Sequence, residues 1–452
     1  MPVWAQYTTA RLSGIVSDPS GAVVAGATIT VQEVGTGYTQ STNSTSGGQY
    51  LFPSLPVGTY QITVSMAGYT SYVQKGIVLS LGQAAAQDVQ LRVGRVEQQV
   101  VVNANSSLVT TDSATVGQLI DQREISQLPL NGRDVQQLVF LAPGTTNVTA
   151  NYCAANCEGG VFPSEQYAKV NGGGANGVNY LLDGVDANDT YINANVPFPN
   201  PDAIQEFNLI TGNMSASFGN AIGGVVNVVT KSGTDQIHGD VFEFVQNSAL
   251  DASDYFSQGH VNPLKQNQFG GSVGGPIVKN RLFYFGSYQG TRFRTANNGQ
   301  IATVPNATER TGDFSDVLPG TQLINPTSGS NYTNNQIPVS PVATYILNHI
   351  PLPNGPNDQL TFNGGPDAQN TDEYLAKVDF NIGKHHLSGH YFQMGYTDPV
   401  FIPPSTNLLE LRGDAEHLVL KNVSVVDIYT ITPTFLLSSY FGYNSENGTT
   451  LS

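Results

Sequence analysis

The chain has 452 residues, only 12% of them charged, and it carries a formal net charge of −16. An excess of negative charge repels phosphate groups, which argues against nucleic acid as a partner. No stretch approaches the ~20 consecutive apolar residues of a transmembrane helix, but short strands of alternating polarity can also cross a membrane. The abundant glycine, tyrosine and phenylalanine (48, 21 and 20 residues) favour strands and turns over helices.

The first residues contain a small-residue pattern of the kind that precedes a signal-peptidase cut. Val3, Trp4 and Ala5 stand before Gln6, but no basic or long apolar segment precedes them. One interpretation is that Met1 is not the true start and that an export signal has been removed. The other is an accidental match, and the sequence leaves both open.

Residues 11–92 contain short stretches of alternating polarity, separated by turns such as Pro19-Ser20-Gly21 and Pro56-Val57-Gly58. Strands spaced about 8–12 residues apart with turn residues between them predict a small β-sandwich. The stretch resembles the carboxypeptidase regulatory-like domain, a transthyretin-like sandwich that is also grouped with carbohydrate-binding folds. The resemblance implies a rigid spacer or, alternatively, a glycan-binding module, and the spacer is favoured. The matching positions are Gly14, Val16, Gly21, Ala27, Gly47, Tyr50, Phe52, Leu55, Gly58, Tyr60, Gly68 and Tyr69.

A valine run flanked by polar residues follows in the linker, residues 94–105. Such a run between two domains predicts an exposed strand without a sheet, which can pair through its main chain with another protein's sheet edge. Glu97 with Val100, Val101 and Val102 resembles a TonB box, and this resemblance implies binding of a TonB-type energy-transducing protein. An ordinary last strand of the sandwich, or a plain linker, is the alternative.

The next unit, residues 106–234, combines one helical pattern with several strands. Apolar residues recur on one side of residues 125–141, and Pro129 predicts that the helix proper begins near Leu130. A strand that ends in Leu181-Leu182 leads into a tight turn at Asp183-Gly184. A glycine pair then opens a β-branched run, and a polar turn follows before the next strand. The residues of this junction are Gly223, Gly224, Asn227, Thr230, Lys231 and Gly233.

These elements resemble the plug domain of TonB-dependent outer-membrane receptors and the junction between that plug and the barrel. The resemblance rests on Leu181-Leu182-Asp183-Gly184 and on the run from Gly223 to Gly233. It implies a gated import channel.

From residue 235 onward, seven strand candidates are joined by long and short connections in alternation. Outer-membrane barrels have this asymmetry, with tight periplasmic turns and long extracellular loops. Residues 371–382 and 434–443 alternate between apolar and polar side chains, as expected with lipid outside and water inside. Residues 281–291 are apolar on both faces, which contact with the plug would explain. The candidates are 237–246, 267–276, 281–291, 371–382, 385–396, 416–430 and 434–444, with short connections at Val278–Asn280, Gly383-Lys384 and Thr432-Pro433. Residues 268–276, 282–288 and 335–338 add a resemblance to the Oar-like group of these receptors.

Several motifs resemble chemical sites but are better explained otherwise. Gly-x-Ser-x-Gly at residues 270–274 is followed by Gly275-Pro276, so the helix of a hydrolase nucleophile elbow cannot start. The acidic stretch at residues 183–189 lacks the glycine and the glutamate of a calcium loop, although an irregular calcium site remains an alternative. His386 and His390 share a strand face but lie too far apart to hold one ion, which favours a polar turn with solvated neighbours.

The two cysteines, Cys153 and Cys157, are four residues apart with no histidine nearby. A local disulfide in an oxidising compartment is favoured over half of a metal site, and free thiols remain open. We predict no catalytic residue, no metal ligand and no cofactor.

The predicted fold is mainly β. It comprises a transthyretin-like β-sandwich (residues 11–92), a linker (94–105), an α+β plug domain (106–234) and the first seven strands of an antiparallel transmembrane β-barrel of about 22 strands (235–452). Seven strands leave two unpaired edges, so we expect the sequence to be a fragment of a chain that continues beyond Ser452.

The resemblance implies TonB-dependent transport of a ligand across the outer membrane of a Gram-negative bacterium, with the N-terminal domain in the periplasm. A saccharide or another large nutrient is the favoured ligand class. The implied partners are a TonB-type energy-transducing protein, outer-membrane lipid and an extracellular ligand. The alternatives are a surface adhesin or structural β-protein, a glycan-binding module without transport, and a secreted carbohydrate-active enzyme.

Overall fold

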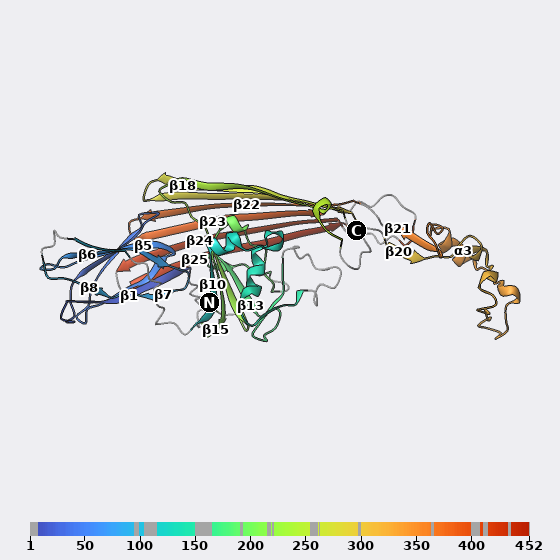
Figure 1. Ribbon diagram of the computed structural model, residues 1–452, viewed down its shortest axis with the longest axis horizontal. Coiled ribbons are helices and arrows are strands. Elements are labelled where there is room, and N and C mark those ends of the chain that lie inside the picture. The colour runs from blue at the N-terminus through green and yellow to red at the C-terminus, as the bar shows by residue number, and fades with distance from the viewer. Residues whose placement is uncertain are drawn as a thin grey trace.

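The computed structural model describes residues 8–94, 99–103, 115–149, 165–189, 193–214, 218, 221–253, 261, 263–296, 300–362, 366–398, 407–409, 415–432 and 435–451. Three bodies follow one another along the chain: a β-sandwich, a central domain described from residue 115 to residue 234, and a wall of long strands (Figure 1). The fold is mainly β, as predicted from the sequence. Among the described helices, none has both the length and the apolar character to cross a membrane.

The sandwich buries one apolar core between two sheets. Leu12, Phe52 and Tyr60 are among its largest fully buried side chains. The first sheet has the order β4-β1-β7, with β8 also paired to β1, and its strands are β1 (Thr9–Ser17), β4 (Gln49–Pro56), β7 (Ala84–Ala86) and β8 (Val89–Gln90). The second sheet has the order β3-β2-β5-β6-β9, and its strands are β2 (Thr28–Glu33), β3 (Thr39–Asn43), β5 (Gly58–Ser65), β6 (Ser71–Leu79) and β9 (Gln99–Asn103).

Strand β9 corrects one expectation about the linker. It pairs in parallel with β6, from Gln99 opposite Ser71 to Asn103 opposite Lys75. The valine run is therefore an edge strand of the sandwich, which was the alternative for this segment, and the expectation of a strand without a sheet is wrong. The physical reason is that β6 would otherwise end the sheet with unpaired N–H and C=O groups, which a valine-rich strand can satisfy. Glu97 lies outside the described residues.

The central domain is an α+β unit whose main sheet has the order β10-β15-β16-β13-β14. Strand β16 is buried along its whole length between antiparallel β15 and parallel β13. A run of valines suits such a position, because both faces of the strand are covered. The bounds are β10 (Val116–Asp121), β13 (Val178–Leu182), β14 (Val185–Asp186), β15 (Ile204–Gly212) and β16 (Gly224–Thr230), with a separate ribbon of β11 (Thr145–Asn147) and β12 (Ala168–Val170).

The helical part of the central domain differs from the prediction. Helix α1 (Gln122–Gln127) lies before Pro129 and is capped by Asp121, whose carboxylate accepts the backbone N–H of Glu124. Beyond Pro129 the chain forms only 3-10 turns, since Gly132 takes a φ of 70° that interrupts a helical path. The predicted α-helix after Pro129 is therefore wrong. The 3-10 turns are η1 (Asn131–Arg133), η2 (Val135–Leu141) and η3 (Pro201–Ala203).

Seven long antiparallel strands form the wall, and each pairs with the next one along the chain. All seven predicted strand candidates overlap these strands. In β22, exposed Tyr374 and Val378 alternate with buried Glu373, Lys377 and Asp379. One face of this strand is thus apolar and exposed, and its inner face carries polar side chains toward the central domain, as predicted. The bounds are β17 (His238–Asn247), β18 (Leu264–Val278), β19 (Leu282–Ala296), β22 (Pro366–Ile382), β23 (His385–Asp398), β24 (Ala415–Thr432) and β25 (Phe435–Leu451).

The connections of the wall are tight at one end and long at the other. At the tight end, Asn280 and Gly383 adopt positive φ angles of 59° in the turns between β18 and β19 and between β22 and β23. The long connection between β19 and β22 folds into an extension that projects from the other end (Figure 1). The predicted turn at Thr432-Pro433 lies partly outside the described residues. The extension contains β20 (Gln300–Thr303), η5 (Glu309–Thr311), η6 (Ser315–Val317), η7 (Thr333–Asn335), α3 (Pro341–Leu347) and β21 (Gln359–Phe362), and η4 (Ser248–Leu250) follows β17.

The sandwich lies at the tight-turn end of the wall, and the central domain packs on the inner face of the wall (Figure 1). The Tyr38 and His386 rings are 5.2 Å apart, centre to centre, and Gln40 Nε2 donates to Thr430 Oγ1 over 3.0 Å. Phe285 of β19 is buried in the same core as the central domain. This contact explains why β19 is apolar on its inner face, where a water-filled lumen would favour polar side chains.

Candidate functional site

The first contact between the central domain and the wall is built around Asp183. Asp183 occupies the tight turn between β13 and β14 with a φ of 46°, a conformation that aspartate tolerates better than most residues. Its carboxylate accepts the backbone N–H of Thr230 over 2.9 Å and the Thr230 hydroxyl over 2.6 Å. The ends of β13 and β16 are therefore tied together inside the central domain, and the carboxylate faces the wall.

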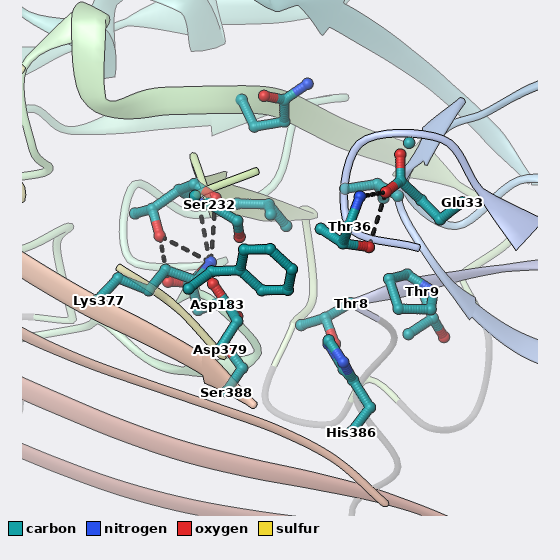
Figure 2. A pocket seen from close by; sticks show the side chains of 18 of the residues that line it. Thr8, Thr9, Glu33, Thr36, Asp183, Ser232, Lys377, Asp379, His386 and Ser388 are labelled. Carbon is teal, nitrogen blue, oxygen red and sulfur yellow. Dashed lines mark hydrogen bonds and ion pairs between the residues drawn. The ribbon is translucent and has the colours of Figure 1, made fainter. Parts of the chain in front are cut away.

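Two side chains of the wall meet this carboxylate. Lys377 Nζ of β22 lies 3.4 Å from Asp183 Oδ1 and also donates to the carbonyl oxygen of Thr230 over 3.1 Å. His390 Nδ1 of β23 lies 2.7 Å from Asp183 Oδ2, and its Nε2 lies 2.8 Å from Asn422 Oδ1 of β24. Figure 2 shows Lys377 and Asp183 pointing toward each other. Three neighbouring strands of the wall thus hold one turn of the central domain.

Burial makes this contact strong. The Asp183 and Lys377 side chains are only 8% and 5% exposed. Burial alone would raise the pKa of Asp183, but the Lys377 ammonium, the His390 ring and the Thr230 hydroxyl together hold that pKa well below its usual range. Removing one partner of a buried ion pair leaves an uncompensated charge, which typically costs about 3–5 kcal/mol. We call Asp183, Lys377 and His390 the latch.

Arg133 forms a second contact between the central domain and the wall. Its guanidinium pairs with Asp202 inside the central domain and donates to Gln289 Oε1 of β19 over 3.0 Å. The same group lies 4.4 Å from the ring centres of both Phe242 and Phe244 of β17. A planar guanidinium suits this position because it can donate hydrogen bonds and stack on aromatic rings at the same time.

The sandwich makes a third contact, with the central domain. The Leu81 backbone N–H donates to Glu206 Oε2 over 2.6 Å, and the Asn208 side chain donates to the Leu81 carbonyl oxygen over 3.2 Å. Burial raises the pKa of Glu206 to about 7, against the lowering effect of the Leu81 N–H and the Ser80 hydroxyl. The sandwich therefore docks through groups that include a carboxyl whose charge changes near neutral pH.

The junction residues predicted from the sequence cluster where the central domain passes into the wall. A Cβ on Gly233 would lie 2.3 Å from the Tyr284 carbonyl oxygen, so only glycine allows this approach to β19. Gly223 and Gly224 lie against Val170 less closely, since a Cβ on either would come within 3.3 Å of that residue. Further along, Asn227 and Thr230 are buried in β16, and burial lowers the pKa of Lys231.

The remaining residues that the sequence singled out are the Leu-Leu-Asp-Gly motif, the two cysteines and the acidic stretch. Leu181 and Leu182 are fully buried in β13, directly before the latch aspartate. Cys153 and Cys157 lie outside the described residues. Asn188 Oδ1 accepts the Tyr180 backbone N–H over 2.7 Å. Within the described ranges, His, Cys, Asp and Glu side chains form no group of three that could hold a metal ion.

The histidine interpretation needs correction at one position. His390 was expected near a polar turn with solvated neighbours, but its ring is buried against Asp183, Asn422 and Ser424. Side chains along β23 alternate between the two faces of the wall. This alternation places His390 on the inner face, where the central domain excludes water. Sequence reasoning also missed Arg133, which no periodic pattern singles out.

The geometry defines a class: a small α+β domain is held by buried polar contacts on the inner face of a seven-stranded antiparallel wall, which is the arrangement of a plug domain and part of its β-barrel. Three family matches give the same division of the chain. A carboxypeptidase regulatory-like domain matches residues 11–92, a TonB-dependent receptor plug domain matches residues 107–225, and an outer membrane beta barrel domain matches residues 229–452. The chain belongs to the TonB-dependent receptors of the Gram-negative outer membrane, with its N-terminal domain in the periplasm. The central domain is the plug.

Two curated proteins resemble this chain in sequence over part of their length. The chain is 28% identical over 295 residues to the TonB-dependent transporter Oar of Myxococcus xanthus, covering 60% of this chain and 26% of Oar. It is 29% identical over 190 residues to the probable TonB-dependent siderophore receptor PirA of Acinetobacter baumannii, covering 38% of this chain and 22% of PirA. The matches thus span about a quarter of the length of these curated relatives.

Two solved structures of outer-membrane proteins align with this chain in three dimensions although their sequence identity to it is low. The outer membrane transporter YddB from Escherichia coli aligns with a TM-score of 0.47 and 10% identity, over 73% of this chain and 38% of YddB. The ferric enterobactin receptor PfeA of Pseudomonas aeruginosa aligns with a TM-score of 0.41 and 14% identity, over 74% of this chain and 41% of PfeA.

Proposed function

We propose that this receptor imports a ligand through the outer membrane and that the plug is its gate. The observation that carries the proposal is the latch, in which Lys377 and His390 of the wall hold Asp183 of the plug by buried contacts. A gate must stay closed without energy and open when work is done on it. A buried ion pair fits this requirement, because parting the two side chains while they stay out of water leaves uncompensated charges, which costs several kcal/mol but breaks no covalent bond.

The work would enter through the valine segment before the plug. Val100 to Val102 form the middle of β9, an edge strand that is joined through the linker to β10 of the plug. An edge strand can accept a strand of another protein through its main chain. The energy-transducing partner would therefore pair with β9 and pull toward the periplasm, in line with the TonB-box resemblance of this segment.

A photocrosslinking experiment tests this partner. A photoreactive residue at Gln99, introduced into the receptor in living cells, should give an adduct with the mass of the receptor plus its energy-transducing partner. Val101→Pro should abolish the adduct, because proline removes a main-chain N–H and cannot take part in strand pairing. Val101→Ala is the matched control, since it keeps the N–H and should preserve the adduct. An adduct that survives Val101→Pro would refute the role of this segment.

Transport itself is tested by energy dependence. Accumulation of ligand should require both the proton-motive force and residues 96–104, whereas a surface adhesin or a glycan-binding module would bind ligand equally well without either. The relatives named as siderophore receptors and the sandwich, with its resemblance to carbohydrate-binding folds, support different ligand classes. We favour a saccharide or another large nutrient as the imported ligand, and growth tests on single nutrients with the receptor gene deleted would decide.

A further inference from the structure

A cavity of about 270 Å³ lies where the sandwich, the plug and the wall meet. The sandwich contributes Glu33 and Thr36, the plug contributes Asp183 and Thr230, and the wall contributes further polar side chains (Figure 2). The cavity lies at the tight-turn end of the wall, which is the periplasmic end in this class of protein. A solute that passes between plug and wall would therefore meet this cavity last.

The charged lining of the cavity is mainly acidic. Three carboxylates, from Glu33, Asp183 and Asp379, face a single ammonium, that of Lys377, and His386 is the remaining titratable side chain of the lining. Lys377 is already engaged by Asp183 in the latch. This leaves Glu33 and Asp379 with no lysine or arginine of their own in the described lining, where His386 is the titratable group that interacts with both.

Asp379 shows that the lining is incomplete without a further group. Its side chain lies on the inner face of β22, and the residue is only 4% exposed. Its Oδ2 atom accepts no hydrogen bond from the described protein. Nearby, Asn381 Nδ2 is buried and finds no acceptor in the described protein. A buried carboxylate oxygen without a donor is costly, so a solute that donates a hydrogen bond would be stabilised there.

Glu33 completes the acidic pair from the opposite side. It is 9% exposed, and its Oε2 accepts the Thr36 backbone N–H and the Thr36 hydroxyl over 2.5 and 2.7 Å. These bonds fix the carboxylate at the edge of the cavity, where Figure 2 shows it across from the wall residues. Glu33 belongs to the sandwich, so the sandwich both closes the cavity and supplies part of its charge.

We propose that this cavity is a periplasmic exit site that selects cationic solutes, such as ammonium-bearing ligands, and disfavours anions. This inference depends on the proposed function in one respect: import sets the direction in which a solute passes the cavity, from the outside to the periplasm. Selection by charge is a property of the cavity, and it can be measured without transport or a known ligand.

The test uses two thiol reagents of similar size and opposite charge. Ser388 lies directly opposite Asp379 in the pairing of β22 with β23, and it lines the cavity. In receptor purified in detergent micelles, with Cys153 and Cys157 replaced by serine, a Ser388→Cys variant would be treated with a trimethylammonium-ethyl or a sulfonatoethyl methanethiosulfonate. Each rate would be divided by that of the same reagent with free mercaptoethanol.

We expect the cationic reagent to react at least about tenfold faster after this correction, because a carboxylate about 5 Å from the thiol attracts one reagent and repels the other. Adding Asp379→Asn should reduce the preference several-fold, since the amide keeps the shape but not the charge. An exposed cysteine at Ser46 of the sandwich should show little preference, and Thr59→Cys provides a second position in the cavity lining.

Equal rates for the two reagents at Ser388→Cys and Thr59→Cys, or a preference that Asp379→Asn leaves unchanged, would overturn the proposal. Neither result would bear on the proposed import, which is tested separately by the β9 crosslink and by energy-dependent uptake. Conversely, a receptor with charge selection but no crosslink would keep the exit site and lose the proposed function.

Discussion

Substituting Lys377 by methionine should weaken the closed gate far more than removing an exposed lysine. Methionine fills a similar volume but leaves Asp183 buried without its ammonium partner. The two side chains are only 5% and 8% exposed, so water cannot replace the lost interaction. Loss of one partner from a buried pair costs about 3–5 kcal/mol, and His390 still contacts Asp183, which favours the lower end of this range.

Hydrogen exchange of the β16 amides, followed by mass spectrometry, measures this effect. A loss of about 3 kcal/mol should speed exchange through local opening by roughly 100-fold or more. Lys265→Met on β18 is the matched control, because Lys265 is exposed and its removal should change exchange less than about threefold.

A double-mutant cycle makes the reasoning refutable. Combining Lys377→Met with Asp183→Asn removes both charges and should cost less than the sum of the single effects, by about 1–3 kcal/mol. Strict additivity, or a Lys377→Met variant that exchanges at the wild-type rate, would show that the two side chains do not act as a latch.

Three further predictions follow from the other contacts. Burial raises the pKa of Glu206 to about 7, so in urea unfolding the stability of the wild type relative to Glu206→Gln should be greatest below pH 4.5 and fall by up to about 3 kcal/mol toward pH 7. Arg133→Lys keeps the charge but loses the stacked guanidinium, so the urea midpoint of the plug should fall by an amount equivalent to about 1 kcal/mol. Gly233→Ala places a Cβ 2.3 Å from the Tyr284 carbonyl oxygen and should reduce the yield of folded receptor, whereas Gly286→Ala, whose nearest contact is 3.8 Å, should not.

Much of the fold follows from local patterns. The alternation of side chains in β22 predicts which residues face inward, because a strand has a period of two regardless of its surroundings. The glycine pair at the start of β16 and the tight turn at Asp183 are likewise local signals. The Pro129 region was misread because a proline can either begin a helix or end one, and here the Asp121 cap decides in favour of the earlier segment.

The site could be predicted only in part. The sequence places Lys377 on an inner face, but its partner Asp183 lies 194 residues earlier in the chain. That pairing depends on how the plug is seated in the wall, which no periodicity encodes. The same limit applies to Glu33 and Asp379, which reach one cavity from the sandwich and the wall.

The central claim is that the second half of the chain is a wall with an outer face toward lipid and an inner face toward the plug. Nitroxide labels placed one at a time along residues 373–380 of β22, in receptor reconstituted into bilayers, test it directly. We predict that accessibility to oxygen peaks at Tyr374, Ala376 and Val378 and falls at the positions between them, with little access for a water-soluble nickel complex at the peaks. High nickel access at those three positions, or no period of two, would contradict the account.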